Sequence, residues 1–460
     1  MKLTLRHIYT FLFLLGIFFI PFNSWEGIKE LAEFKRESSA IFFFLGFLFV
    51  ILEIVFTKKI FIYNNPILII VLIFLLWNVL TIVFNFPSVL DNYYKKTPGL
   101  NRFIRQFISL LISCGMFFIL YLYSLRHIET ENILYKIRKI LLCSLIFSSI
   151  YSFFEIIYII TGFFPAYKVL LLFDYFPFVE SDNHGIRISS VSWEPPALAT
   201  FLITISGWMF SYILTSKNLY KYLPTLLVLI LTYYSGSRTA LIVVFIQLIA
   251  FFFIYLSKKQ LVRFLKSSIV IIMLISAFIF ITKPEKILND IGKKIESLDF
   301  KGNLKKNISN QSRFGIQYAN FMVFLENPFV GVGYGQQVYH AIDYYPIWAK
   351  KDNWEFKYLY LNKNEPAFPP GYNLYIRLLA ETGIIGFLIF IFLIYTLFKK
   401  SYSFIRNDTS EIKTLGMILF ISFIGYSFNF FQLDTFRIYG FWFCVAITLT
   451  LSSRIYIGKK

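Results

Sequence analysis

The sequence is poor in the residues that build metal sites and disulfide frameworks. Its 460 residues include three cysteines and four histidines, and 15% are charged. Cys114, Cys143 and Cys444 lie in apolar stretches without paired spacing, so neither a zinc site nor a disulfide framework is predicted. His184 and His340 have no neighbours at metal-ligand spacing. We therefore expect no metal and no cofactor.

Apolar residues dominate instead. Hydrophobic residues make up 57% of the chain and aromatic residues 21%, and phenylalanine alone occurs 57 times. A soluble domain has too little interior to bury this much apolar surface. Apolar stretches of about 20 residues recur along the chain, which is the length that a membrane-spanning helix needs. We expect an all-α polytopic membrane protein, with residues 1–460 forming a single transmembrane domain.

The apolar pattern predicts about twelve transmembrane helices. The first stretch resembles a signal peptide but lacks a small-residue cleavage site, so we interpret it as an uncleaved span. The predicted spans are 8–22, 39–56, 63–84, 103–124, 139–161, 196–215, 222–235, 238–256, 267–282, 374–398, 412–430 and 435–452.

The net charge of +19 favours one orientation of these spans. With both termini cytoplasmic, the inner segments carry 21 of the 45 Lys and Arg, and the short outer segments carry 11. Long loops are exempt from the positive-inside rule, so this comparison predicts cytoplasmic termini. Anionic membrane lipids explain the positive charge, and no nucleic-acid partner is expected.

Two predicted outer segments are long. They are 162–195 and 283–373, and loops of this size usually carry function. In the second loop, apolar residues between 287 and 298 recur at helical spacing with lysines among them. This pattern predicts an amphipathic helix on the membrane surface.

Arg238 is the first candidate ligand-binding residue. It stands in SGSRTAL between two predicted spans, so its guanidinium must lie at the outer rim of the bundle. An arginine there either reaches toward lipid headgroups or clamps an anion, for which its planar fork is suited. The backbone N–H groups of Ser235, Gly236 and Ser237, near the start of the next helix, would also favour an anion.

Arg313 is the second candidate. An apolar helical face follows it, and Asn327-Pro328 should end that helix. The face comprises Phe314, Tyr318, Phe321, Phe324 and Leu325. Gly331, Gly333 and Gly335 then permit tight turns. No strand precedes these glycines and no Lys-Ser/Thr pair follows them, so a nucleotide site is not predicted.

Arg187 and Glu194 stand in HGIRISSVSWEPPALATF, before the sixth predicted span. Glu194 precedes Pro195-Pro196, so it either stabilises a helix start or accepts a proton from a sugar hydroxyl. Trp193 beside it belongs either to an aromatic belt at the membrane surface or to a sugar-stacking site. We predict Arg187 as a ligand-binding residue and Glu194 as the acid/base candidate.

The stretch PPGYNLYIRLLAETGIIG, from Pro369, brings polar residues to the mouth of the tenth predicted span. Tyr372, Asn373 and Arg377 therefore look like the acceptor side of a transferase site. Gly383 and Gly386 should let this helix pack closely against its neighbours. An arginine cluster at a membrane surface suits an anionic ligand that is itself in the membrane, and a polyprenyl pyrophosphate meets both demands.

Three motifs in order resemble the O-antigen polymerase and O-antigen ligase superfamily. They are SGSRTAL, then SR followed by an aromatic-rich helix and NPFVGVGYG, then YN-x9-G-x2-G in YNLYIRLLAETGIIG. EPPALATF is similar to the polymerase side of the family. The detailed resemblance covers roughly residues 160–395.

The resemblance implies a bacterial inner-membrane glycosyltransferase of the C type, which uses undecaprenyl-pyrophosphate-linked glycans and needs no metal. By position, Arg238 and Arg313 match the two outer arginines of the family that engage the pyrophosphate. Tyr372 stands where ligases carry a histidine, and this departure counts against a ligase. The catalytic candidates are thus Glu194, Arg238, Arg313 and Tyr372; Arg187, Arg238, Arg313, Asn373 and Arg377 are expected to bind substrate.

We favour a polysaccharide polymerase for O-antigen, capsule or a similar product. The alternatives are a ligase that transfers glycan to lipid A core or protein, and a lipid-linked oligosaccharide flippase. A transporter would be expected to carry internal repeats and charge at the membrane midplane, whereas the polar clusters here lie at the outer rim. Membrane lipids, a chain-length regulator and a flippase are further candidate partners.

Overall fold

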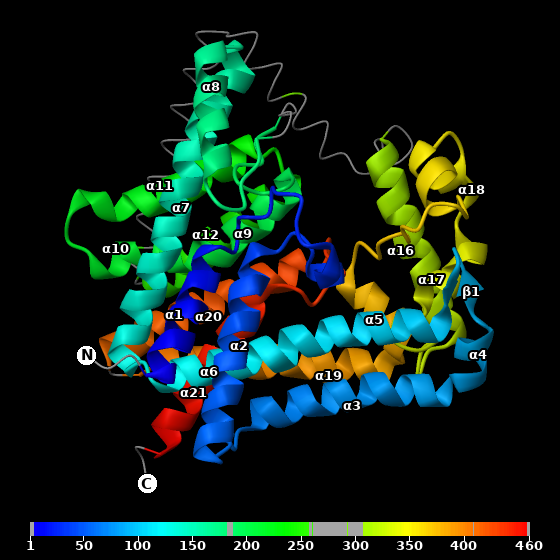
Figure 1. The fold of residues 1–460 in the computed structure, drawn as a ribbon, viewed down its shortest axis with the longest axis horizontal. Coiled ribbons are helices and arrows are strands. Elements are labelled where there is room, and N and C mark those ends of the chain that lie inside the picture. Colours follow the sequence, from blue (N-terminus) through cyan, green and yellow to red (C-terminus); the bar gives the residue numbers. More distant parts are fainter. Residues whose placement is uncertain are drawn as a thin grey trace. The chain divides into compact units, whose positions relative to one another are not determined.

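The computed structural model describes residues 4–181, 187–256, 260, 292, 307–407 and 409–457. Regular structure in these residues is almost entirely helical, and strands β1 (Tyr93–Tyr94) and β2 (Thr97–Pro98) form one short antiparallel hairpin (Figure 1). The bilayer core has no water for backbone N–H and C=O groups, so an apolar chain satisfies them within helices. The prediction of an all-α polytopic membrane protein is confirmed.

Eight helical segments in the described ranges are long and apolar enough to cross a membrane. They are α2 (Ser38–Thr57), α3 (Pro66–Phe84), α5 to α6 (Gly99–Arg126), α7 (Thr130–Thr161), α9 to α10 (Pro195–Thr215), α12 (Arg238–Tyr255), α19 (Leu374–Ile405) and α20 (Ser410–Asn429). Three shorter apolar helices are Leu5–Phe18, Leu219–Tyr234 and Tyr439–Ile455. These eleven segments coincide with predicted spans. The remaining span, 267–282, and all of the amphipathic segment 287–298 except residue 292 lie outside the described residues.

The described residues group into two compact units. Unit 1 comprises Met1–Leu76, Arg105–Leu248 and Leu388–Lys460. Unit 2 comprises Trp77–Ile104 and Ile249–Phe387. The single transmembrane domain stays a prediction, and each unit is described by itself below.

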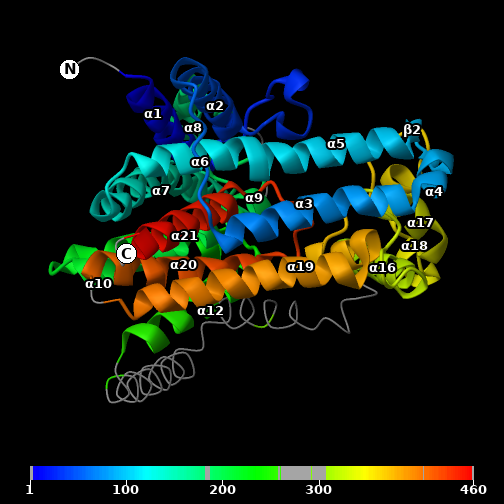
Figure 2. The same ribbon diagram turned by 90° about the horizontal axis from the view of Figure 1, so that it is seen from below.

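Unit 1 is a bundle of closely packed helices. Its further elements are α1 (Leu5–Phe18), η1 (Lys29–Phe34), α8 (Phe164–Leu172), η3 (Phe173–Tyr175), η4 (Leu219–Tyr222), α11 (Leu223–Tyr234) and α21 (Tyr439–Ile457). Helix α1 packs along α2 and α9 along α20, and α20 lies beside α21 (Figure 2). Gly207 lets α9 approach α20, and the buried Gln247 Nε2 donates to the carbonyl oxygens of Ile203 and Ile421, each at 3.1 Å. Small residues and buried amides are the usual means of joining membrane helices.

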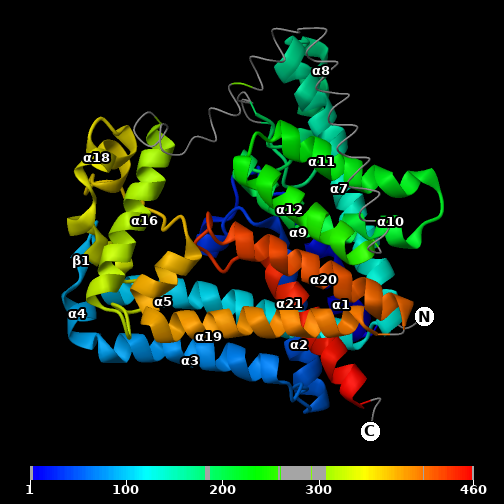
Figure 3. The same ribbon diagram turned by 180° about the vertical axis from the view of Figure 1, so that it is seen from behind.

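Unit 2 is built around α16 (Ile308–Glu326). This helix packs against η5 (Ala341–Tyr344), α18 (Ile347–Lys350) and η6 (Glu355–Tyr360), as Figure 3 shows for α16 and α18. The side chain of Asn307 caps its first turn by accepting from the N–H of Asn310. The helix ends at Glu326, as the Asn327-Pro328 pair predicts.

Helix α16 buries a different face from the one that its aromatic residues would suggest. Its buried side consists of small and polar residues with a few aliphatic ones: Asn310, Gln311, Ser312, Gly315, Ile316, Ala319, Asn320 and Val323. Tyr318, Phe321 and Leu325, from the predicted apolar face, are 48%, 41% and 53% exposed. An exposed apolar face on a helix is expected where lipid rather than water surrounds it.

Helix α19 is broken at Gly383, whose backbone angles are φ +63° and ψ −171°. The glycine loop 327–335 satisfies the backbone groups that the break exposes. The N–H groups of Val332 and Gly333 donate to the carbonyl oxygens of Ala380 and Glu381, at 3.0 and 2.9 Å. The N–H of Ile384 donates to the carbonyl oxygen of Pro328 at 2.8 Å. The prediction that Gly383 serves only close packing is therefore incomplete, because no other residue fits this conformation readily.

The three loop glycines adopt positive φ angles, as tight turns require. Gly331, Gly333 and Gly335 have φ of +73°, +101° and +81°. A Cβ at Gly331 would collide with the backbone of Glu381 and Thr382. The motif NPFVGVGYG is thus explained by close approach to the broken helix α19 rather than by a phosphate ligand.

Candidate active site

Arg313 and Tyr372 come together in unit 2. The Cζ atom of Arg313 lies 5.2 Å from the centroid of the Tyr372 ring, which is within the range of a cation–π contact. The Nε atom of Arg313 is buried and has no hydrogen-bond partner among the described residues. A buried N–H without a partner is costly, so this group is suited to an incoming oxygen ligand.

Tyr372 is held in a conformation that tyrosine rarely adopts. Its φ is +54°, in the left-handed region. Its hydroxyl lies 2.9 Å from the hydroxyl of Tyr360, and its carbonyl oxygen accepts from Nε2 of Gln317 at 3.3 Å. Residues in sparsely populated backbone conformations persist where their surroundings hold them, and they are common at functional sites.

Asn373 and Arg377 make internal contacts. The Oδ1 of Asn373 accepts from the N–H groups of Tyr375 and Ile376, at 3.0 and 3.2 Å, and so caps the start of α19. The Nε of Arg377 donates to Oε1 of Glu381 at 3.0 Å, and both side chains are buried. Their predicted contacts with substrate stay predictions, and both residues have a structural role that explains the motif without a ligand.

Arg187 and Arg238 both lie at one turn of unit 1, around Gly236. The side chain of Arg187 lies over Gly236, where a Cβ would stand 2.5 Å from Cδ of Arg187. Gly236 has a φ of +62°, and Arg238 follows it as the first residue of α12. Ser237 caps this helix, since its Oγ accepts from the N–H of Ala240 at 3.3 Å. The sequence motif SGSR thus forms a tight turn that ends at Arg238 and lies under the side chain of Arg187.

Glu194 begins α9, as the following prolines predict. Its carbonyl oxygen accepts from the N–H groups of Ala197 and Leu198, while its exposed carboxylate makes no capping hydrogen bond. The ring of Trp193 carries the guanidinium of Arg36, with Cζ 3.1 Å from the ring centroid. The role of Glu194 as an acid/base group stays a prediction.

A comparison with protein families supports the resemblance. The model of the family described as O-antigen ligase matches residues 223–391. The chain carries an O-antigen ligase family domain. The predicted resemblance to the O-antigen polymerase and ligase superfamily is confirmed for these residues, and the members of this family are membrane enzymes of the glycosyltransferase type. No curated protein matched the chain.

The family domain contains most of the predicted site. Arg238, Arg313, Tyr372, Asn373 and Arg377 fall within the matched residues. Arg187 and Glu194 precede them. Arg313 and Tyr372 contact each other in unit 2, whereas Arg187, Glu194 and Arg238 belong to unit 1.

The part of the chain that the structure describes contains no group of three or more His, Cys, Asp or Glu side chains that could hold a metal. His340 instead lies near an amide, with its Nε2 3.5 Å from Nδ2 of Asn92. His184 lies outside the described residues.

Glu155 is a structural residue that the sequence alone did not reveal. Its fully buried carboxylate accepts from the N–H groups of Ser189 and Ser190, each at 2.9 Å. Ser190 has a φ of +56°, and its hydroxyl donates to the carbonyl oxygen of Ser148 at 2.9 Å. Glu155 therefore fixes the loop between Arg187 and Glu194. A glutamate within a predicted membrane span was the available signal, since buried charge in a span usually has a specific partner.

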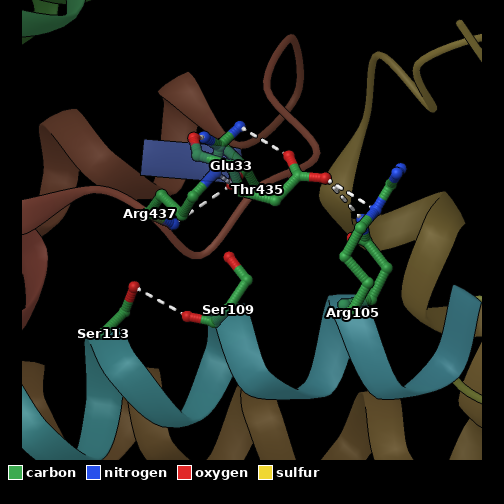
Figure 4. A network of polar contacts seen from close by, with 7 residues as sticks. Glu33, Arg105, Ser109, Ser113, Thr435 and Arg437 are labelled. Carbon is green, nitrogen blue, oxygen red and sulfur yellow. Dashed lines mark hydrogen bonds and ion pairs between the residues drawn. The ribbon is translucent and has the colours of Figure 1, made fainter. Parts of the chain in front are cut away.

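A second network in unit 1 links three distant segments (Figure 4). Oε1 of Glu33 lies 3.1 Å from Nε of Arg105, and its Oε2 lies 3.7 Å from Nη2 of Arg437, so the carboxylate pairs with both arginines. Arg437 also donates to the carbonyl oxygen of Glu33 and, through Nε, to Oγ1 of Thr435 at 3.3 Å. These partners stand too far apart in sequence for spacing to reveal them. Arg105 is half-exposed, so its pair with Glu33 stabilises the fold only modestly.

Proposed function

We propose that this protein is a polysaccharide polymerase of the cytoplasmic membrane. It transfers a growing glycan from undecaprenyl pyrophosphate to a hydroxyl of a lipid-linked repeat unit on the outer face. The proposal rests mainly on the surroundings of Arg313. Its buried Nε has no hydrogen-bond partner among the described residues, and its guanidinium lies against Tyr372. This arrangement suits a pyrophosphate oxygen at Arg313 beside a sugar hydroxyl at Tyr372.

The reaction is a substitution at the anomeric carbon of the donor. The acceptor oxygen forms the new glycosidic bond, and the bond to the pyrophosphate oxygen breaks with its electron pair. Negative charge therefore grows on the leaving pyrophosphate. Arginines positioned before the reaction stabilise this charge, so no metal is needed.

The proposal also assigns a role to each of the other predicted residues. Arg187 and Arg238 offer guanidinium groups to pyrophosphate oxygens in unit 1, where the side chain of Arg187 lies over Gly236 and Arg238 begins α12. Glu194 accepts the proton of the acceptor hydroxyl, and its side chain is exposed at the start of α9. Tyr372 orients that hydroxyl, since a phenol with a pKa near 10 is a weak base at neutral pH. Asn373 and Arg377, at the start of α19, bind the substrate.

Ligase activity is the second candidate, because the matched family is described as O-antigen ligase. Such an enzyme would transfer finished glycan to lipid A core or a protein. The tyrosine at position 372, where ligases carry histidine, favours the polymerase. The termini are cytoplasmic in this proposal, and a flippase and a chain-length regulator act before and with the enzyme.

Replacement of Arg313 by glutamine tests the proposed site. Loss of one preorganised donor to a developing charge lowers the rate by roughly 10²–10³-fold. Polymer formation from lipid-linked repeats should fall by this factor in membranes that contain normal amounts of the protein. Arg406→Gln is the matched control, because this exposed arginine contacts the hydroxyl of Tyr402 at 2.8 Å in a different part of the chain. Full polymer from the Arg313 variant would refute the proposal.

Deletion of the gene separates the reaction classes. A polymerase deletion leaves single repeats on the carrier or the final acceptor, and a ligase deletion accumulates long chains on the carrier. Single repeats trapped on the cytoplasmic side would instead indicate a flippase.

A further inference from the structure

Tyr360 contacts Tyr372, the tyrosine of the proposed site. It is the last residue of η6 and 8% exposed, and its ring packs against Phe356 at 5.6 Å between centroids. Its hydroxyl lies 2.9 Å from the hydroxyl of Tyr372. Tyr372 is the less buried member of this pair, so it is the one that can reach a ligand.

The β1–β2 hairpin holds the backbone around Tyr360 by hydrogen bonds. The hydroxyl of Tyr94 donates to the carbonyl oxygen of Tyr360 at 3.3 Å. The buried Lys95 donates through Nζ to the carbonyl oxygens of Leu359 and Ala367, both at 2.6 Å. Hydrogen bonds from a charged donor are stronger than neutral ones. Tyr360 is thus fixed at its backbone, its ring and its hydroxyl.

The chemistry of two phenols makes this fixed position useful. A phenolic O–H prefers the plane of its ring but can point to either side, and a hydrogen-bond partner selects the side; the oxygen can both donate and accept. A bond between the two hydroxyls uses one hydrogen and one lone pair, and it fixes the direction in which Tyr372 can donate or accept. Burial, followed by the neighbouring Tyr372, raises the pKa of Tyr360, so this hydroxyl keeps its proton at neutral pH.

We propose that Tyr360 is a positioning residue for the transfer reaction. Its hydroxyl orients that of Tyr372 toward the acceptor sugar hydroxyl, while Tyr360 itself does not touch the substrate. The inference rests on the proposed function, because it assigns Tyr372 to the acceptor. The left-handed backbone of Tyr372 fits this role, since a strained residue needs a fixed neighbour to keep its place.

The test is a double-mutant cycle with Tyr360→Phe and Tyr372→Phe, measured in purified full-length protein with lipid-linked acceptor. Tyr360→Phe removes one neutral hydrogen bond, so kcat should fall about threefold to tenfold while KM for the acceptor changes little. The double variant should be no slower than Tyr372→Phe, because Tyr360 acts through Tyr372. Tyr358→Phe is the matched control, as this tyrosine lies in the same element and is 57% exposed.

Two outcomes would overturn the inference: an unchanged kcat for Tyr360→Phe, or effects of the two substitutions that multiply independently. If Tyr372→Phe is slow and Tyr360→Phe is normal, the inference fails while the proposed function stands. If Arg313→Gln and Tyr372→Phe are both normal, the proposed function itself fails. Should Tyr360→Phe not fold, 3-fluorotyrosine at 360 keeps the ring and strengthens the donor; it should change kcat, and an unchanged kcat would overturn the inference.

Discussion

The Nε atom of Arg377 lies 3.0 Å from Oε1 of Glu381, and both side chains are buried in the turn of α19 that precedes the break at Gly383. Loss of one partner leaves the other charge buried and unpaired, which costs about 3–5 kcal/mol. Arg377→Met should therefore lower the thermal unfolding midpoint in detergent strongly. Arg377→Met with Glu381→Leu should restore most of it, because replacing both charges by apolar groups is often neutral.

This pair of variants also separates structure from function for Arg377. If Arg377 binds substrate, the stable double variant stays inactive. Recovered activity in the double variant would assign Arg377 to structure alone.

Gly383 and Gly162 allow the cost of a positive φ to be separated from the cost of a collision. Both have positive φ, +63° and +67°, but a Cβ at Gly383 would collide with the carbonyl oxygen of Phe329, while Gly162 faces open space. Gly162→Ala should cost about 1–2 kcal/mol. Gly383→Ala should cost clearly more and reduce the yield of monodisperse protein. Equal unfolding midpoints for the two variants would contradict the packing described for α19.

Glu155→Gln should loosen the loop between Arg187 and Glu194. Glutamine offers one acceptor oxygen, so one of the N–H groups of Ser189 and Ser190 loses its partner at a cost of about 1–3 kcal/mol. Limited trypsin digestion, followed by mass spectrometry, should show faster cleavage after Arg187. Glu131→Gln is the control, since this exposed glutamate lies in the first turn of the same helix. Cleavage at the rate of the unaltered protein would mean that the loop is held by other contacts.

His340 should make unit 2 less stable in mild acid. Burial lowers the pKa of His340 below its ordinary 6.5, against the opposing influence of Asp343 and Glu326. The unfolded chain then binds a proton more readily than the folded one, so stability falls as pH drops below about 6.5. The unfolding midpoint between pH 7.5 and 5.5 should decline less in His340→Gln than in the unaltered protein. His7→Gln, at an exposed histidine, should leave the decline as it is.

The parts of the molecule that follow from local pattern were predictable. Apolar length located the membrane helices, Asn327-Pro328 located the end of α16, and prolines located the start of α9. The spacing of glycines indicated tight turns, but their partner, the broken α19, lies some fifty residues away in sequence. Hydropathy does not show such a break, because Leu378, Leu379 and Ala380 before Gly383 and the long apolar stretch after it give one continuous predicted span.

The sequence singled out the candidate site residues one by one, and their roles stay predictions; the contact between Arg313 and Tyr372 could not be read from the sequence. Arginine next to small residues at a membrane surface pointed to Arg238 and Arg313. Nothing in the sequence distinguishes Tyr360 from the other tyrosines among the 31 in the chain. Only its contact with the hydroxyl of Tyr372 in the folded protein sets it apart. Glu33 and Arg437 likewise meet across most of the chain.

Loop 327–335 is hydrogen-bonded to the break in α19, and we call this pairing the stem. Residues 336–371 lie between its two strands of chain and are called the insert. Arg313 precedes this stem and Tyr372 follows the insert. Because α16 packs against η5, α18 and η6 within 336–371, changes in this segment can move Arg313 relative to Tyr372. A replacement of this segment must therefore keep both the residues that pack on α16 and the tyrosine whose hydroxyl contacts that of Tyr372.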